Sequence, residues 1–237
     1  MSDEKTTTIR YGDHPDQFAE LMEPSGKPRG VAVLVHGGFW KPEYGIEYAR
    51  PLAPSLVAAG WTTWAIEYRR GAGPTNMLAD VRAAIAACPV DGKVVVAIGH
   101  SAGGHLAMWA ATQGVGLTHV VAQAAVSDLT AAHRANLGGG AVERFLGHPP
   151  ALADASLDPI QQLPLDVPVW CIHGRDDENV PISQSREYVE AATSAGGVAE
   201  LVEVSGDHFT VVDPSSDAWA TTLEHLASLT LSKDSSG

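Results

Sequence analysis

One serine of the chain stands in a sequence that favours nucleophilic chemistry. Residues Gly99–Gly103 read Gly-His-Ser-Ala-Gly, follow the apolar run Val94–Ile98 and precede the apolar run Leu106–Ala111. This order predicts a strand, a sharp turn and a helix, with small residues where the strand end and the helix start nearly touch. A hydroxyl exposed on such a turn lies beside the first helical N–H groups, which would face an anion formed there. Ser101 is therefore the candidate nucleophile, and the alternative is an ordinary glycine-rich turn.

An acid and a histidine follow two other apolar runs. Asp176 and Asp177 come after Val167–Ile172, and His208 comes after Ala199–Ser205. Because ligands of a parallel sheet bind beyond the carboxyl ends of its strands, we expect these side chains and the serine to share one edge. In nucleophilic acyl transfer an imidazole takes the serine proton, and a carboxylate holds the imidazole in the required tautomer. The order serine, acid, histidine predicts this chemistry, with either aspartate as the acid.

Strands and helices alternate along the chain, which predicts an α/β fold with a mostly parallel sheet covered by helices on both faces. The first two strands are expected to form an antiparallel edge pair. The predicted strands are Thr6–Tyr11, Gln17–Met22, Gly30–Val35, Trp61–Tyr68, Val94–Ile98, Thr118–Val126, Val167–Ile172 and Ala199–Ser205. The predicted helices are Tyr44–Ala59, Thr75–Ala87, Ser101–Gln113, Ser183–Ala195 and Ser215–Leu231.

Length and composition predict one globular unit. A chain of 237 residues that is 45% hydrophobic can bury one core, so we expect a single domain over 1–237. The net charge of −13 argues against nucleic acid and against anionic membrane surfaces as partners. The oligomeric state is left open by the sequence.

Targeting and redox signals favour the cytoplasm. The N-terminus is polar and lacks the basic-then-apolar order of a secretory signal, and no apolar run is long enough to span a membrane. Cys88 and Cys171 lie far apart, each beside apolar residues, and are interpreted as free thiols of a reducing compartment.

The motifs together resemble those of the α/β-hydrolase superfamily, in its esterase and lipase branch, which includes small kynurenine formamidase-like serine hydrolases. The resemblance covers nearly the whole chain, from His36–Trp40 (His-Gly-Gly-Phe-Trp) through Gly99–Gly103 and His173–Pro181 to His208. It implies an α/β-hydrolase fold with a central sheet of about eight strands and no full lid domain. Residues 128–166 would then be a short cap-like insert. The tail 232–237 is expected from its own sequence to be disordered.

The resemblance also assigns the site. In this superfamily the serine follows the fifth strand of the sheet, the acid the seventh and the histidine the eighth. Ser101, one of the two aspartates and His208 occupy the matching places. The family's acid stands three residues before the Val of a Val-Pro pair, which selects Asp177 over Asp176. His208 is the histidine in the last strand-to-helix loop, and the alternative is a surface-loop histidine.

Backbone N–H groups are expected to hold the developing oxyanion. One donor would be Ala102, and another would be Gly38 or Phe39 of the Gly-Gly-aromatic turn, the choice between these two remaining open. Trp40 either lines the pocket or packs under the loop, and Phe145 and Leu146 are further candidate apolar walls of the substrate pocket.

Other polar groups are expected to be structural. His36 and His100 would support the turns and His105 would be buried beside the serine turn, while Asp128 would cap the helix after its strand. Ion pairs near the sheet edge are expected among a further set, Glu67, Arg69, Arg70 and Asp80. No spaced set of metal ligands, phosphate loop or dinucleotide fingerprint is present, which indicates chemistry without a metal or cofactor.

These features predict a serine hydrolase that acts on a small-molecule ester or amide, most simply a carboxylesterase for small or medium esters. An arylformamidase is the alternative enzyme, supported by the His-Gly-Gly-Phe-Trp form. A non-catalytic ligand-binding protein on the same fold is the alternative of another class.

Overall fold

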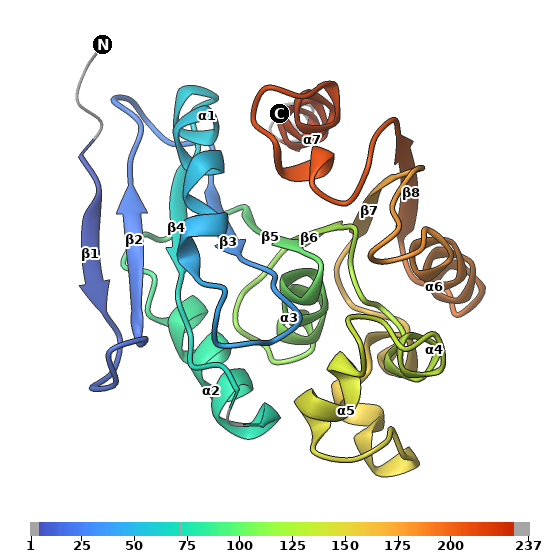
Figure 1. The fold of residues 1–237 in the computed structure, drawn as a ribbon. Helices are drawn as coiled ribbons and strands as arrows, with labels where there is room; N and C mark the ends of the chain where they lie inside the picture. The colour runs from blue at the N-terminus through green and yellow to red at the C-terminus, as the bar shows by residue number, and fades with distance from the viewer. Residues whose placement is uncertain (1–4, 72, 230–237) are drawn as a thin grey trace.

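Eight strands form one sheet in the part of the chain that the structure describes. The structure is a computed structural model that describes residues 5–71 and 73–229. Figure 1 shows the sheet crossing the molecule with helices on either side of it. The strands are β1 (Thr7–Arg10), β2 (Phe18–Met22), β3 (Val31–Val35), β4 (Thr62–Ile66), β5 (Val95–His100), β6 (His119–Gln123), β7 (Val169–Gly174) and β8 (Ala199–Val204).

The sheet is mostly parallel, as predicted. Its strand order is β1-β2-β4-β3-β5-β6-β7-β8. Strands β3 to β8 run parallel to one another, whereas β1 pairs antiparallel with β2 and β2 antiparallel with β4. The predicted antiparallel edge pair is therefore confirmed. This topology brings the carboxyl ends of β3, β5, β7 and β8 to one edge, where the candidate site residues follow.

Helices cover both faces of the sheet. They are α1 (Ala53–Ala58), α2 (Pro74–Ala86), α3 (Ala102–Ala111), α4 (Leu129–Arg134), α5 (Ala141–Leu146), α6 (Ser183–Ser194) and α7 (Asp217–Ser228). Helices α2, α3 and α6 share one apolar cluster, and α1 and α7 share a second cluster on the opposite face. Strand β3 alternates between them: Val31, Val33 and Val35 belong to the first cluster, and Ala32 and Leu34 to the second.

The segment predicted as one helix over Tyr44–Ala59 is divided into three. Two short 3-10 helices, η1 (Ile46–Tyr48) and η2 (Arg50–Leu52), precede α1. Pro51 lies at the start of η2 and Pro54 at the start of α1. A proline has no N–H to donate and its ring clashes with the preceding turn, so it begins a helix more readily than it continues one.

Residues 128–166 form a group of short helices beside α3 (Figure 1). They contain α4, α5 and the 3-10 helices η3 (Leu152–Leu157) and η4 (Pro159–Gln162). The carboxylate of Asp128 accepts a 2.7 Å hydrogen bond from the backbone N–H of Ala131, so it caps α4 as predicted. Leu129 and Phe145 are buried in the cluster that contains α3. The predicted tail 232–237 lies outside the described residues.

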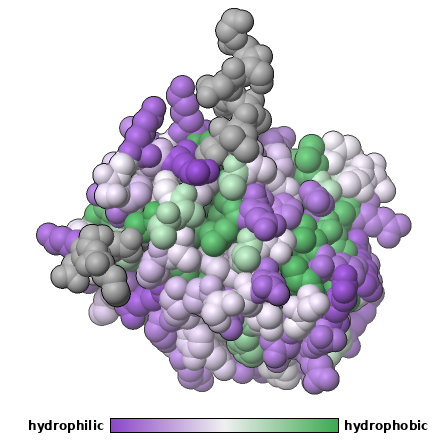
Figure 2. Space-filling view, turned by 90° about the horizontal axis from the view of Figure 1, so that it is seen from above, coloured by the Kyte–Doolittle hydropathy of each residue, from purple (hydrophilic) through white to green (hydrophobic). Residues whose placement is uncertain are grey.

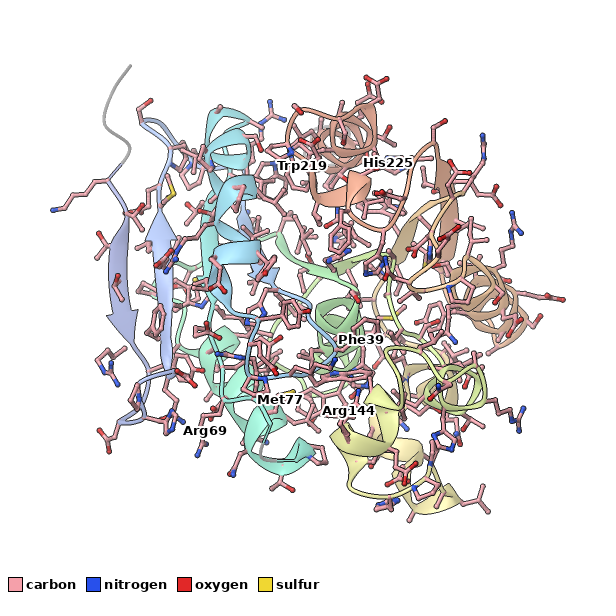
Figure 3. The ribbon with its side chains drawn as sticks, in the orientation of Figure 1. Phe39, Arg69, Met77, Arg144, Trp219 and His225 are labelled. Atoms are coloured by element: carbon pink, nitrogen blue, oxygen red, sulfur yellow. The ribbon has the colours of Figure 1, made fainter. Side chains whose placement is uncertain are left out.

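Helices α1 and α7 are joined by a side-chain contact on their face of the sheet. Trp219 of α7, labelled in Figure 3, is buried and donates its indole N–H to Ser55 Oγ over 2.8 Å. Seen from above, the visible surface is largely hydrophilic with interspersed hydrophobic patches (Figure 2). Over residues 5–71 and 73–229, no helix combines the length and the apolar character that crossing a membrane requires.

Candidate active site

Ser101 occupies the strained turn that its sequence predicts. It lies between β5 and α3 with φ 55° and ψ −121°, a conformation that non-glycine residues seldom adopt. A Cβ atom on Gly99 would lie 2.2 Å from the carbonyl oxygen of Gly103, and one on Gly103 would lie 2.2 Å from the carbonyl oxygen of Val35. The glycines of the motif are therefore required by the close approach of strand and helix.

Asp177 and His208 are in direct contact. Oδ2 of Asp177 accepts a 2.7 Å hydrogen bond from Nδ1 of His208, and both side chains are buried. Oδ1 of Asp177 accepts from the backbone N–H groups of Asn179 and Val180 at 2.9 Å and 2.8 Å. Burial opposes ionisation of this carboxyl, but the contacts with His173, His208 and Val180 hold its pKa well below the usual range. A carboxylate here can only accept, so Nδ1 of His208 carries its proton and Nε2 is left to accept one.

The other candidate acid lies elsewhere. Asp176 is exposed, and its backbone N–H donates to the carbonyl of Gly206 over 3.0 Å. Of the two neighbouring aspartates, Asp177 is therefore the one that contacts His208.

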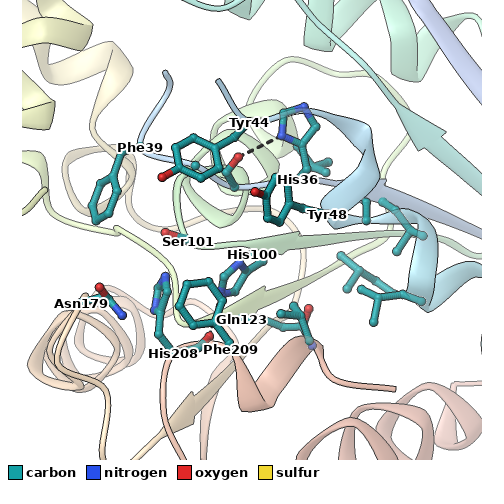
Figure 4. Close-up of a pocket in the computed structure, with 18 residues that line it drawn as sticks. His36, Phe39, Tyr44, Tyr48, His100, Ser101, Gln123, Asn179, His208 and Phe209 are labelled. Atoms are coloured by element: carbon teal, nitrogen blue, oxygen red, sulfur yellow. Dashed lines mark hydrogen bonds between the residues drawn. The ribbon is translucent and has the colours of Figure 1, made fainter. Parts of the chain in front are cut away.

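Ser101 and His208 line the same cavity (Figure 4). It encloses about 140 Å³ and lies between the loop after β3, the segment with η1 and η2, and the loop after β8. Among the described residues, no hydrogen bond joins Ser101 Oγ to His208. Such bonds are often long in ligand-free enzymes and tighten when substrate binds.

The loop after β3 lines this cavity with the residues predicted to stabilise an oxyanion. Gly38 has φ 114° and Phe39 has φ 51°, so both adopt left-handed conformations. A Cβ atom on Gly38 would lie 2.2 Å from Cβ of Tyr44, which requires glycine there. Within the described chain, no group accepts a hydrogen bond from the backbone N–H of Gly38, Phe39 or Ala102. The three predicted oxyanion donors are thus unengaged, with Gly38 and Phe39 lining the cavity.

A buried carboxylate holds this loop in place. Oε1 of Glu67 lies 3.0 Å from Nε2 of His36, and Oε2 accepts from the backbone N–H of Ile46 over 2.9 Å. Arg70 also contacts this carboxylate. Burial opposes its charge, yet the contacts with His36, Arg70 and Ile46 lower the pKa of Glu67. Tyr68 stacks on the His36 ring and donates its hydroxyl to the His36 carbonyl over 2.7 Å.

The predicted ion pairs are confirmed, because Arg70 pairs with Glu67 and Arg69 with Asp80, the latter at 2.7 Å. The sequence reasoning did not assign Glu67 a role in holding the loop. The signal available was its position: Glu67 is one residue beyond β4, at the edge of the sheet where the strands that precede the other site residues also end.

His100 supports the loop that contains His208. Its Nε2 donates to the backbone carbonyl of His208 over 2.8 Å, and the two rings lie 4.5 Å apart between centroids. Burial lowers the pKa of His100 to about 3, so the ring is neutral near pH 7. The prediction that His100 is structural is consistent with this contact.

The cavity beside Ser101 is not lined by the three predicted pocket residues, Trp40, Phe145 and Leu146. All three are buried in the cluster that contains α3, and none lines the cavity beside Ser101. The Trp40 and Phe145 rings stack at 4.6 Å, and Trp40 meets His105 edge-on at 5.3 Å. The structure therefore corrects the pocket assignment: Trp40 packs under the loop, and apolar side chains of the 128–166 segment fill that side of the turn.

The cavity instead has an aromatic rim from segments that the sequence reasoning did not assign to the site. Tyr44 and Tyr48 lie on one side of it and Phe209 on the other (Figure 4). Tyr48 is 49% exposed and Phe209 58% exposed. The signals available in the sequence were two tyrosines in the stretch predicted as a helix and a phenylalanine directly after His208.

A mostly parallel eight-stranded sheet with a strained serine turn after β5 defines the α/β-hydrolase fold. The chain belongs to the prolyl oligopeptidase family, whose model matches residues 61–227. It is also similar to the esterase LipC of Mycobacterium tuberculosis, with 28% identity over 218 residues that cover 77% of this chain and 53% of LipC. The chain thus spans about half the length of this curated relative.

Solved structures share the fold over nearly the whole chain. A truncated carbohydrate esterase from gut microbiota superposes with a TM-score of 0.82 at 19% identity, covering 97% of this chain and 98% of that one. Esterase 2 of Thermogutta terrifontis superposes with a TM-score of 0.74 at 23% identity, covering 94% of this chain and 91% of that one.

Proposed function

We propose that this protein is a serine hydrolase that cleaves small carboxylic esters through an acyl-enzyme intermediate. The observation that carries the proposal is the 2.7 Å contact between Asp177 and His208 at the cavity that His208 shares with Ser101. The esterase names of LipC and of the structural neighbours support an ester as the substrate.

The first half-reaction transfers the acyl group to the enzyme. Nε2 of His208 takes the Ser101 proton while Oγ attacks the ester carbonyl carbon, and Asp177 stabilises the resulting imidazolium. The carbonyl oxygen becomes an oxyanion, which the N–H groups of Ala102 and of Gly38 or Phe39 stabilise by a few kcal/mol each. When the C–O bond to the alcohol breaks, His208 gives its proton to the departing oxygen.

The second half-reaction releases the acid. Water takes the place of the alcohol, His208 removes its proton, and the hydroxyl oxygen attacks the acyl carbon of the Ser101 ester. The tetrahedral intermediate collapses, His208 returns the proton to Oγ, and the carboxylic acid leaves.

The cavity favours a small group beside the carbonyl. Its 140 Å³ is close to the volume of an engineered protein cavity that holds benzene. Acetyl to butyryl groups fit such a volume, whereas an octanoyl chain has to extend past the aromatic rim. The free thiols of Cys88 and Cys171 support action in a reducing compartment, which we propose to be the cytoplasm.

An arylformamidase is the second candidate, favoured by the His-Gly-Gly-Phe-Trp sequence of residues 36–40. The same serine, histidine and aspartate would cleave a formyl C–N bond. Among the described residues that line the cavity there is no charged Lys, Arg, Asp or Glu to bind an amino-acid head group, so we place the ester first.

The test is a comparison of wild type with Ser101→Ala on p-nitrophenyl acetate, butyrate and octanoate and on N-formylkynurenine. We expect turnover of acetate and butyrate that the substitution lowers by about 10⁴-fold or more. Preferential deformylation would move the assignment to the arylformamidases. Absence of any turnover in the wild type would favour a non-catalytic binding protein.

A further inference from the structure

Gln123, at the end of β6, lines the cavity with a polar side chain that the proposed mechanism does not use. Gln123 pairs with His100 of β5 in the sheet, and its backbone carbonyl accepts a 2.8 Å hydrogen bond from the N–H of Ser101. Side chains at paired positions of neighbouring parallel strands lie on the same face, roughly 4.8 Å apart. The Gln123 side chain therefore lies beside His100, one strand away from the serine turn.

Contacts on one side of the Gln123 amide determine its orientation. Its nitrogen lies 2.7 Å from the carbonyl oxygen of Val211 and 3.3 Å from Oγ1 of Thr222. A carbonyl oxygen can only accept, so the amide nitrogen must be the atom that faces Val211. The amide oxygen is consequently turned away from the 3-10 helix η5 (Thr210–Val212), toward the residues that line the cavity (Figure 4).

That oxygen has no hydrogen-bond partner within the described chain. Gln123 is 0% exposed, so bulk water does not solvate it either. An unsatisfied buried acceptor destabilises the protein, and a bound donor would recover that cost. The oxygen is therefore an unfilled acceptor on a side chain that lines the cavity containing Ser101.

The surroundings of this acceptor are apolar. Leu34 pairs with Ile98 in the sheet, and Ile98 lies two residues before His100, so these side chains share the Gln123 face. Leu52 and Val212 complete this part of the cavity. A water molecule is retained in such a place only when it finds two to four polar partners. A ligand that buries carbon against these side chains and ends in one donor suits the site better.

We propose that Gln123 is a specificity-determining residue whose amide oxygen accepts a hydrogen bond from a neutral hydroxyl or amide N–H on the substrate group that enters the cavity. The inference rests on the proposed ester hydrolysis at Ser101 and adds the class of substrate. A neutral donor is favoured because none of the described lining residues carries a carboxylate that would balance an ammonium group. Gln123 is about one strand spacing from His100, the residue before Ser101, so the donor would be a few bonds away from the ester group that Ser101 attacks.

The test uses pairs of esters that differ only in a methyl group and a hydroxyl. On the acyl side these are p-nitrophenyl butanoate and p-nitrophenyl 3-hydroxypropanoate, and on the alcohol side propyl acetate and 2-hydroxyethyl acetate. For each pair the ratio of kcat/KM, hydroxyl over methyl, is compared between wild type and Gln123→Met. Intrinsic reactivity cancels in this comparison.

We expect the ratio of one pair to be about tenfold higher in wild type than in Gln123→Met. The matched control is Thr222→Val, which removes one contact of the same amide nitrogen but keeps the oxygen, and it should leave the ratio unchanged. Equal ratios in wild type and Gln123→Met for both pairs would overturn the proposal, and would mean that water or nothing fills the acceptor.

A binding measurement separates this proposal from the proposed function. Dissociation constants of 3-hydroxypropanamide and butanamide are measured by NMR titration of the wild-type protein. Tighter binding of the hydroxyl compound supports the role of Gln123 even if no ester is turned over, and equal binding overturns it. The same wild-type preference decides the question if Gln123→Met does not fold.

Discussion

The two sides of the Ser101 turn differ in how they are filled. On the side of the 128–166 segment, called the packed side, Trp40, His105 and Phe145 pack ring against ring. On the side of η1 and η5, called the open side, Tyr48 and Phe209 are among the residues that line a cavity. Both sides are rich in aromatic residues, so the difference lies in packing rather than in composition.

Each side of the turn also contains a buried carboxyl group, and the two groups differ in the direction of their pKa shift. Asp177, on the open side, is held ionised by His173, His208 and Val180, which together outweigh its burial and lower its pKa. Asp158, on the packed side, accepts from the backbone N–H of Leu129 and from the Gln161 amide, but these contacts do not outweigh its burial, which raises its pKa to about 6. The contacts of Asp177 thus favour its charged form beside the cavity, whereas the burial of Asp158 shifts that carboxyl toward its neutral form.

The largest expected effect tests the charge of the open side. Asp177→Asn removes the group that orients and stabilises the His208 imidazolium, so kcat should fall by about 10⁴-fold on p-nitrophenyl acetate. Asp176→Asn is the matched control and should stay within a few-fold of wild type. A comparable loss in both variants would show that the two aspartates were assigned wrongly.

The second prediction compares the loss of stability caused by one substitution on each side of the turn. Phe145→Ala opens a void in the cluster with Trp40 and His105, and should lower the free energy of unfolding by about 3–5 kcal/mol. Phe209→Ala removes a side chain that is 58% exposed and should cost far less. Urea unfolding followed by circular dichroism measures both, and similar losses would contradict the contrast between the two sides.

The placement of Ser101, Asp177 and His208 at one edge of the sheet was predictable because its signals are local in the sequence. The serine turn needs glycines at fixed offsets, and the aspartate and the histidine follow strands whose apolar runs are easily recognised. The interruption of the 44–59 helix was signalled by Pro51 and Pro54. Which side of the turn is hollow depends on how side chains from distant segments fill space, and a linear pattern does not contain that information. Phe145 and Leu146 were therefore assigned to the pocket and Trp40 was left between pocket and packing, while Gln123, a lone polar residue at the end of a strand, was missed.

A third prediction concerns stability against pH. The pKa of Asp158 is about 6 in the folded protein and near 3.9 when unfolded, so the folded state holds this proton more tightly. Its contribution to stability is fully present below about pH 4 and is lost as the pH rises through about 6, a change of about 3 kcal/mol at most. Asp158→Asn should remove this decline, as measured by urea unfolding from pH 4 to 7.

The control for this experiment is Asp166→Asn, which changes the charge by the same amount at an exposed position of the same segment. A decline between pH 4 and 6 that persists unchanged in Asp158→Asn would show that another group causes it.

The smallest expected effect is a change of selectivity. Ala49 lines the open cavity, and Ala49→Leu should fill part of it. We expect the ratio of kcat/KM for butyrate over acetate esters to fall by about tenfold, since one methylene in an apolar pocket changes selectivity by roughly 10–200-fold. Leu146→Ala, on the packed side, should leave the ratio unchanged. A shift in the second variant but not in the first would place the substrate on the other side of the turn.

The most direct test of the account is the crystal structure of the protein after reaction with butyl fluorophosphonate. We predict that phosphorus is bonded to Ser101 Oγ, that its oxygen lies against the N–H groups of Ala102 and of Gly38 or Phe39, and that the butyl chain lies in the cavity between Tyr48 and Phe209. Modification of another residue, or a butyl chain seated among Trp40 and Phe145, would contradict the account.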